Sequence, residues 1–458
     1  MIGKKLFDDF SEVSAKAWKQ KIQYDLKGAD YNDSLVWQSP EGIDVKPFYH
    51  ADDLSTSNAS RPSAPEEWNI GQVIYAGNAT MANEKALIAI GRGVECIAFT
   101  IPSEEIDIEK LLLGIEIKKI PIHLNMQFLS HRFIQSLVAY TADSENVFYN
   151  IDVIGNLARS GNWYFNLKKD FNLFSKIITT DTLHVVQIDV SLYENAGADI
   201  TQQLGYAMAQ ANEYLHYFEE KGILKTLKSI LFKVAVGSNY FFEIAKLRAI
   251  RILWKTLATE YGLHIDCEIS AMPSRRNKTI YDYNVNLLRS TMESMAGILG
   301  GANTIFNMPY DAIYHKDNEF GERIALNQLV LLKKESYFDK VTNPADGAYY
   351  IEKLTAQLAE RGLQLFKKVE RNGGFLKQLK AHKIQQEIKE NALKQEQRFE
   401  SQEDVLVGSN KFQNQNDKMK QDLEIHPFIK INPRKTIIEP VVERRLAEAL
   451  EKKRLDNE

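Results

Sequence analysis

Two short runs, HVVQIDVS (184–191) and LFKVAVGS (231–238), decide the fold class of this chain. Each run is almost continuously apolar and rich in β-branched residues, which is typical of a strand buried on both faces. The amphipathic stretch ITQQLGYAMAQANEYLHYFEEKG (200–222) lies between them and is long enough to cross over from one strand to a parallel neighbour. The pair therefore predicts a parallel βαβ unit.

The same alternation extends along the chain in both directions. Six more runs of this kind are VIYAG (73–77), ECIAFTI (95–101), IPIHLNM (120–126), VFYNIDV (147–153), HIDCEIS (264–270) and ANTIFNM (302–308). Amphipathic segments separate most of them. Eight strand–helix units predict an α/β protein, a closed (β/α)8 TIM barrel, with a doubly wound open sheet as the alternative fold.

Segments of different character flank the barrel region. Residues 1–67 are polar and rich in turns, and they predict an N-terminal extended arm. Within the arm, residues 7–26 are expected to be helical. Residues 68–375 form the predicted barrel. Residues 376–458 are rich in Lys, Gln and Glu and predict a charged helical tail.

Composition excludes several functional classes. The net charge of −4 provides no basic field for nucleic acid, and no run approaches the roughly 20 apolar residues of a membrane span. The N-terminus lacks the apolar core of a secretory signal. Two cysteines, Cys96 and Cys267, are too few for a disulfide framework or a cysteine zinc site. We expect a cytoplasmic protein with two buried thiols and no metal.

Chemistry in a (β/α)8 barrel occurs at the C-terminal ends of the strands. Those ends carry polar side chains here, and the candidate pocket residues are Tyr75, Asn125, Gln127, Asp152, Asp189, Ser191, Ser238, Asn239 and Glu268. The three carboxylates can support acid–base chemistry or hold a hard cation. The interpretation we favour is that they accept hydrogen bonds from loop backbone. His123, His184 and His264 are expected to be hydrogen-bonded barrel residues.

Several stretches resemble the methylmalonyl-CoA mutase family. They are WKQKIQYDLKG (18–28), SPEGIDVKPFY (39–49), VAVGSNYFFEIAKLRAIRILW (234–254), NKTIYDYNVNLLRSTMESMAGILGGANTI (277–305), ERIALNQLVLLKKES (322–336), NPADGAYYIE (343–352) and VGSNKFQNQ (407–415), in the family's order. The resemblance implies a coenzyme-A-binding barrel. It also implies an adenosylcobalamin-dependent isomerisation of methylmalonyl-CoA and succinyl-CoA.

The sequence departs from the family's pattern at the catalytic positions. Aligned through NAGA (195–198), the family's essential histidine falls on Leu192, which cannot donate a hydrogen bond. The family's substrate-contacting tyrosine matches Tyr75 only with two inserted residues. A family arginine that binds the substrate carboxylate falls near Ser160, where the adjacent Arg159 is a candidate substitute.

Active members also carry a cobalamin-binding domain with a D-x-H-x-x-G loop, and this sequence contains no such motif. We therefore expect no cobalamin-binding domain. The resemblance is to the small, non-catalytic chains of heterodimeric bacterial enzymes. It implies a chain with no catalytic residue and no cofactor of its own, whose partner is a catalytic large subunit that holds adenosylcobalamin. The resemblance also implies that the arm, residues 1–67, and the tail contact this partner subunit. Alone, such a chain can pair with a second copy of itself.

Two alternative functions remain open at this point. One is an acyl-CoA mutase barrel that acts with a separate cobalamin-binding protein. The other is a coenzyme-A-binding structural or regulatory module.

Overall fold

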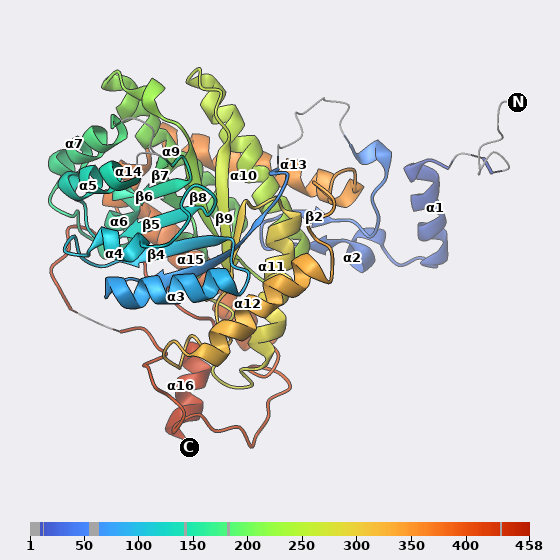
Figure 1. Ribbon diagram of the computed structural model, residues 1–458. Helices are drawn as coiled ribbons and strands as arrows, with labels where there is room; N and C mark the ends of the chain where they lie inside the picture. The colour runs from blue at the N-terminus through green and yellow to red at the C-terminus, as the bar shows by residue number, and fades with distance from the viewer. Residues whose placement is uncertain (1–9, 12, 55–63, 142–143, 181–183, 431–432) are drawn as a thin grey trace, which may run out of the picture.

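Eight parallel strands close into a barrel in the order β10–β3–β4–β5–β6–β7–β8–β9 (Figure 1). The computed structural model describes residues 10–458 except 12, 55–63, 142–143, 181–183 and 431–432. The strands are β3 (Asn69–Tyr75), β4 (Cys96–Ile101), β5 (Ile122–Met126), β6 (Val147–Ile151), β7 (His184–Asp189), β8 (Ile230–Val236), β9 (Cys267–Pro273) and β10 (Thr304–Phe306). The closed barrel is confirmed and the open sheet is excluded.

Helices that follow the strands cover the outside of the barrel (Figure 1). They are α3 (Ala79–Gly91), α4 (Ile108–Leu112), α5 (His131–Thr141), α6 (Val153–Ser160), α7 (Leu167–Ile178), α8 (Ser191–Asn195), α9 (Ile200–Glu220), α10 (Tyr240–Glu260), α11 (Val285–Leu299) and α12 (Glu319–Lys334). The apolar faces of these helices pack on the outward-facing strand residues and form one continuous core. Cys96 and Cys267 are buried free thiols, as expected; Cys267 belongs to this core and Cys96 to a smaller cluster with Ala98 and Phe306.

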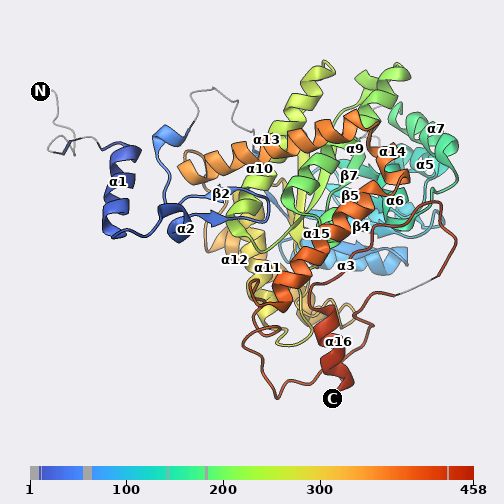
Figure 2. The ribbon, with the colours of Figure 1, turned by 180° about the vertical axis from the view of Figure 1, so that it is seen from behind.

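A long helix, α13 (Tyr349–Arg371), lies across α9 and α10 on the outside of the barrel (Figure 2). Glycines permit the close approach of α13 to α9. A Cβ atom on Gly362 would lie 2.8 Å from the Leu204 side chain, and one on Gly205 would lie 2.8 Å from Leu365. The two helices therefore pack backbone against side chain without a gap. None of the described helices is both long and apolar enough to cross a membrane.

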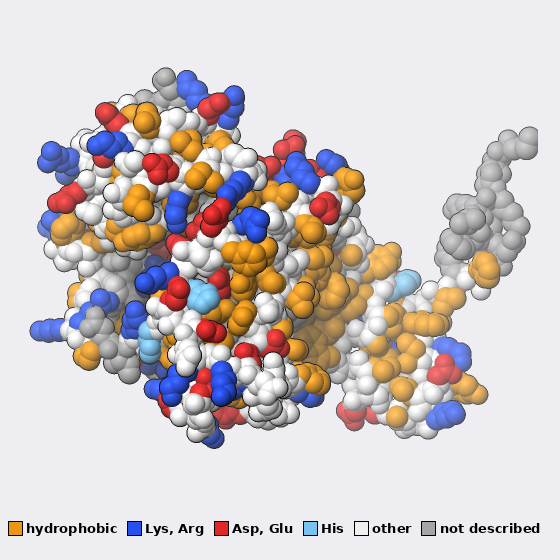
Figure 3. All heavy atoms as spheres, turned by 60° about the horizontal axis from the view of Figure 1, so that its bottom comes forward, with side chains coloured by type: hydrophobic (Ala, Val, Ile, Leu, Met, Phe, Trp, Pro, Cys, Tyr) orange, Lys and Arg blue, Asp and Glu red, His pale blue; other side chains and the backbone are white. Residues whose placement is uncertain are grey.

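The N-terminal arm is fixed to the barrel at its inner end and projects at its outer end. It comprises α1 (Ala15–Asp25), α2 (Tyr31–Leu35), the hairpin strands β1 (Trp37–Gln38) and β2 (Asp44–Val45), and the 3-10 helix η1 (Ala51–Asp53). Trp37 packs on Phe242 of α10, with ring centroids 5.7 Å apart, and Tyr49 packs on Tyr350 of α13 at 5.0 Å. By contrast, α1 has no buried residue and stands away from the barrel in a separate lobe (Figure 3).

The helix of the arm is shorter than the expected stretch of residues 7–26. It begins at Ala15 because the Ser14 hydroxyl caps it by accepting a hydrogen bond from the backbone N–H of Ala17. Phe10 and Val13 therefore precede the helix, and both are exposed. Residues 1–9 and 12 lie outside the described residues.

The C-terminal region contains three helices, α14 (Phe375–Lys380), α15 (Lys383–Glu400) and α16 (Glu448–Asp456). Ile384 and Ile388 of α15 are buried against the barrel core. Between α15 and α16 the chain is irregular, and residues 433–446, which we call the C-terminal strap, cross the loops at the C-terminal ends of the strands.

Backbone hydrogen bonds attach the strap to three separate parts of the barrel. The N–H groups of Ile438, Val441, Arg444 and Leu446 donate to the carbonyls of Gly161, Ala158, Asn195 and Arg276, respectively. The strap therefore joins α6, the end of α8 and the loop after β9.

Candidate functional site

A cavity of about 700 Å³ occupies the interior of the barrel toward the C-terminal ends of its strands. Six of the predicted candidates line it: Asn125, Gln127, Asp152, Arg159, Asp189 and Ser191. Strand residues Thr100, Asn150, Gln187, Lys233, Ser270 and Met272 also contribute. Their side chains face the interior because alternate residues of a barrel strand point inward.

Aromatic rings form the floor of the cavity. His123 and Phe306 line it, with ring centroids 6.2 Å apart, and His123 stacks on Phe148 at 4.5 Å. Phe148 in turn lies 4.7 Å from His184. Burial lowers the pKa of His123 to about 4, and its Nδ1 lies 3.2 Å from the Asn150 amide nitrogen. His123 is therefore a hydrogen-bonded barrel residue, as the sequence predicts, and its lowered pKa favours the neutral imidazole.

Asp189 is the electrostatic centre of the cavity. Its side chain is 3% exposed, and its Oδ2 lies 2.5 Å from a guanidinium nitrogen of Arg159 and 3.2 Å from the Lys233 amine. The Ser191 hydroxyl donates to Oδ1. Burial alone would raise the pKa of Asp189, but the two cations outweigh it and hold this pKa well below its usual range. Asp189 is therefore a fixed anion.

Asp152 lines the cavity and anchors the backbone around it. Its carboxylate caps α6 by accepting from the N–H of Gly155 at 2.7 Å, and it also accepts from the N–H of Asp189 at 3.0 Å. The Gln210 amide and the Tyr214 hydroxyl donate to it at 2.6 Å each. Burial raises the pKa of Asp152 to about 6 despite these donors. Asp152 thus holds loops and helices in place.

The rim of the cavity is formed by the C-terminal strap and the loop after β9. Arg434 of the strap donates to the Ser160 carbonyl at 2.7 Å, and Glu443 accepts from the Asn195 amide at 3.1 Å. Arg275 also lines the cavity, and its guanidinium is exposed, without a side-chain partner among the described residues. The rim therefore presents cationic side chains from distant parts of the chain.

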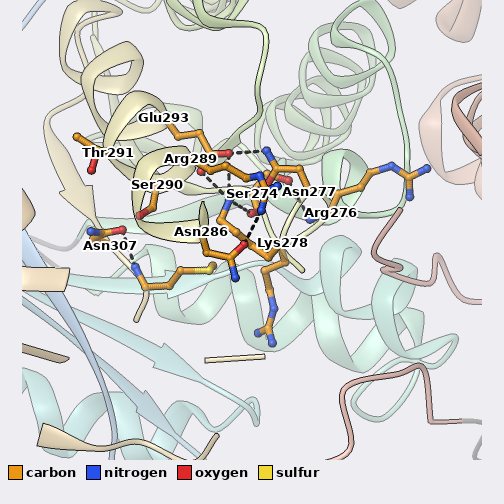
Figure 4. Close-up of polar contacts among 12 residues, drawn as sticks. Ser274, Arg276, Asn277, Lys278, Asn286, Arg289, Ser290, Thr291, Glu293 and Asn307 are labelled. Atoms are coloured by element: carbon orange, nitrogen blue, oxygen red, sulfur yellow. Dashed lines mark hydrogen bonds and ion pairs between the residues drawn. The ribbon is translucent and has the colours of Figure 1, made fainter. Parts of the chain in front are cut away.

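A buried polar network supports the loop that carries Arg275 (Figure 4). The Lys278 amine lies 2.7 Å from the Glu293 carboxylate, and both side chains are almost fully buried. Asn277 donates to the same carboxylate at 2.6 Å. Arg289 donates to the Val407 carbonyl at 2.7 Å, which ties α11 to the C-terminal region. The network fixes the loop between β9 and α11 at the rim.

Four predicted candidates lie outside the cavity lining, and so does the position of the family's histidine. Tyr75, the last residue of β3, is exposed. Ser238 and Asn239 precede α10 and do not line the cavity. Glu268 is the second residue of β9, near its N-terminal end, because this strand begins at Cys267. Leu192 of α8 is fully buried in the hydrophobic core.

Sequence reasoning missed several residues of the cavity. Lys233 had a detectable signal, since it is the one charged residue within the apolar run LFKVAVGS. Gln187 likewise interrupts HVVQIDVS. No sequence signal marks Arg434 and Glu443 as cavity residues, because their place at the rim depends on the path of the strap. Among the described residues, no group of three or more His, Cys, Asp or Glu side chains could hold a metal ion.

Comparisons with known proteins agree with this architecture. A family model described as methylmalonyl-CoA mutase matches residues 101–453. The methylmalonyl-CoA mutase small subunit of Porphyromonas gingivalis is 33% identical over 446 residues, which cover 90% of this chain and 71% of that protein. The methylmalonyl-CoA mutase of Cereibacter sphaeroides is 27% identical, with 86% of this chain and 64% of that protein covered.

The large subunit of methylmalonyl-CoA mutase from Streptomyces virginiae is also similar, at 25% identity, with 87% of this chain and 62% of that protein covered. The chain thus spans 62 to 71% of the length of these three relatives. The family model covers most of the barrel and of the C-terminal region, including the strap. This chain therefore belongs to the methylmalonyl-CoA mutase family.

Proposed function

We propose that this chain is a non-catalytic small subunit of a methylmalonyl-CoA mutase and that it supports a catalytic large subunit. The observation that carries the proposal is Leu192. It stands where the family's histidine is expected, and it is fully buried in the core. A side chain at this position contributes to packing and has no access to the cavity lining.

The titratable groups of the cavity also support an inactive barrel. Acid–base catalysis requires a group whose pKa lies near the working pH and whose proton can move. His123 has a pKa of about 4 and is enclosed by rings. Asp189 is held as an anion by two cations. Asp152, whose pKa is about 6, lines the cavity but already accepts four hydrogen bonds from the protein.

In this proposal, adenosylcobalamin belongs to the large subunit. The family uses this cofactor, and imidazole is a common protein ligand of transition-metal ions. The imidazole that lines the cavity, on His123, is 5% exposed and lies at the floor beside Asn150 and Phe148. The residues present at this site do not fit the cofactor.

The arm supplies the surface for the large subunit. Trp18 and Tyr24 of α1 are exposed, as are Phe10 and Val13 before it. Figure 3 shows hydrophobic side chains gathered on this projecting lobe. Exposed aromatic clusters of this kind mark protein contacts, because aromatic residues dominate the buried centres of interfaces. We propose that this lobe packs on the catalytic subunit.

Co-expression with a catalytic large subunit tests the proposal. We expect a stable complex with isomerase activity, and at least about tenfold weaker association for Trp18→Ala, since aromatic anchors carry much of the binding energy. Tyr337→Ala is the matched control, because Tyr337 is exposed on the barrel, outside the arm. Full activity and stability of the large subunit alone would contradict a supporting role.

The same reagents test the two alternative functions. The isolated chain is mixed with adenosylcobalamin and several acyl-CoAs, with and without a separate cobalamin-binding protein. Turnover in any mixture would establish an active mutase barrel. Saturable binding of coenzyme A without turnover would favour a coenzyme-A-binding module. We expect neither result.

A further inference from the structure

The turn of the arm's β1–β2 hairpin, residues 39–43, is seated on the barrel, and we call it the hairpin tip. Ile43 is 1% exposed and belongs to the main core. The N–H of Ser39 donates to the Ile43 carbonyl at 2.9 Å, and the Ser39 hydroxyl accepts from the Ile43 N–H at 3.2 Å. Arg361 of α13 donates to the Gly42 carbonyl. The tip is therefore a compact turn that is pressed against the helices of the barrel.

The hairpin tip carries a carboxylate into this contact. Glu41 is a half-buried residue, but its Oε2 atom is enclosed and has no hydrogen-bond partner among the described residues. No Lys, Arg or His side chain in the described part of the chain forms an ion pair with it. Burial without a partner favours the uncharged form of a carboxyl group.

Two neighbouring carboxylates act in the same direction as burial. Asp199 caps the start of α9, and Glu243 lies in the first turn of α10. Burial raises the pKa of Glu41 to about 7, and repulsion from Asp199 and Glu243 contributes to the shift. Lys246 is close by, but its amine lies 2.5 Å from the Glu243 carboxylate and is paired with it. Lys246 therefore neutralises Glu243 and leaves Glu41 without a cation.

The other charged and titratable groups around the tip do not supply that cation either. Arg361 is bonded to a backbone carbonyl of the tip, and Lys394 of α15 attracts Asp199. Tyr350 of α13 also faces Glu41, and burial raises the pKa of this phenol to about 12, so it is neutral near pH 7. The seated hairpin therefore fits the protonated form of Glu41 better than the anion.

We propose that Glu41 makes the attachment of the arm to the barrel depend on protons, so that the arm is held tightly in mild acid and more loosely above neutrality. The hairpin tip is then a proton-sensitive clasp. The proposal concerns the contact between the arm and the barrel within one chain. It does not require a large subunit, a cofactor or a substrate.

The direction of the effect follows from the two states of Glu41. In a detached arm the carboxyl group returns to water, where its pKa is about 4.3. The seated value is higher, so attachment is strongest below about pH 4.3 and weakens as the pH rises to about 7. Above that pH both states are ionised and the effect levels off. The opening equilibrium should rise by about a factor of ten per pH unit in the middle of this range.

Hydrogen exchange of the isolated chain at pH 5.5 and at pH 7.5 tests the proposal, after the chemical exchange rate at each pH is divided out. The amides of Ser39, Gly42 and Ile43 are the readout, because all three are hydrogen-bonded within the tip. Their opening equilibrium should increase by about twentyfold between the two pH values. Amides of β5 in the barrel are the internal reference and should change little.

Variants assign the effect to one carboxyl group. Glu41→Gln should change by less than about threefold over the same range, because its amide does not ionise. Glu41→Ala removes the group by a different route and should behave alike, which guards against a disturbance caused by either side chain. Asp44→Asn is the matched control, since Asp44 is an exposed carboxylate of the same hairpin, and it should retain the parent response.

Two results would overturn the proposal. One is a parent protein whose tip amides open equally at both pH values while the β5 amides stay protected. The other is a parent-like rise in Glu41→Gln and Glu41→Ala, which would assign the pH dependence to another group. Because no partner protein enters the measurement, neither result bears on the proposed role as a small subunit.

Discussion

The guanidinium of Arg159 lies 2.5 Å from the carboxylate of Asp189, and the same carboxylate faces Lys233 from the other side. Arg159 follows β6, Asp189 ends β7 and Lys233 lies within β8, so one anion links three successive barrel units. The Asp189 carboxylate therefore contributes to the stability of the fold by pairing with both cations. Its removal leaves two cations in an enclosed space.

Asp189→Asn should therefore destabilise the fold. A fully buried pair that loses one partner costs about 3–5 kcal/mol, and the partial exposure of the cations reduces this to about 2–3 kcal/mol at pH 7. Because the folded-state pKa of Asp189 is lowered, its contribution is present above the unfolded-state pKa of about 4 and is lost as the pH falls below it. Urea unfolding at pH 7 and at pH 3 measures both effects. Asp25→Asn, in an exposed pair, is the control and should change little.

The contribution of Asp152 to the free energy of unfolding should depend on pH in the opposite direction to that of Asp189. Its folded-state pKa of about 6 lies above the unfolded value, so its ionisation destabilises the folded protein as the pH rises from about 4 to 6. The stability of the parent protein relative to Asp152→Asn should therefore fall by about 2–3 kcal/mol between pH 4 and pH 7. Urea unfolding of both proteins across this range measures the difference. A constant difference would show that Asp152 titrates normally.

Leu192→His should not create activity. The imidazole would replace a fully buried leucine in the core and would find no place in the cavity. We expect a loss of about 3 kcal/mol in the free energy of unfolding, from burial of an unpaired polar ring. Leu192→Met, which conserves volume, should lose less than about 1.5 kcal/mol. Turnover by the histidine variant with adenosylcobalamin and methylmalonyl-CoA would refute the assignment of an inactive barrel.

Glu293→Gln should loosen the loop that carries Arg275. It leaves the buried Lys278 ammonium without its carboxylate partner, at a cost of about 3–5 kcal/mol. Replacing both partners, as Lys278→Met with Glu293→Leu, should restore most of the stability because no charge remains buried. A double-mutant cycle in urea quantifies the coupling. Additive single and double effects would show that the two side chains act independently.

Gly161→Ala should release the C-terminal strap. Gly161 has φ of +77°, and a Cβ atom there would lie 2.7 Å from the Ile438 carbonyl oxygen. Gly222→Ala is the control, since Gly222 has φ of +69° but no atom within 4 Å of the added methyl group. Both variants incur the left-handed backbone cost of about 1–2 kcal/mol, but only Gly161→Ala also clashes. Proteolysis within residues 433–446 should be faster in Gly161→Ala alone.

The barrel was predictable because its signal is local and repeated. Each strand run, such as ECIAFTI, is apolar on both faces, and the helices between the runs fix the parallel direction. Strand boundaries were less certain. HIDCEIS places Glu268 near a strand end, but β9 starts at Cys267 and continues to Pro273, so Glu268 lies at the opposite end of the strand.

The cavity was predictable only in part. Asp152 and Asp189 follow from the rule that polar residues gather at the C-terminal ends of barrel strands. That rule does not say which strand-end side chains reach the cavity, and Tyr75 is exposed and is not part of the cavity lining. The contribution of the strap depends on contacts between residues more than 200 positions apart, such as Arg434 and Ser160. No local pattern encodes such contacts.

The strap gives the site a particular order of assembly during synthesis. The strands and helices of the barrel leave the ribosome first, but the rim remains incomplete until residues 433–446 emerge and bond to α6, α8 and the loop after β9. A nascent or truncated chain would therefore have a barrel whose interior is open to chaperones and proteases.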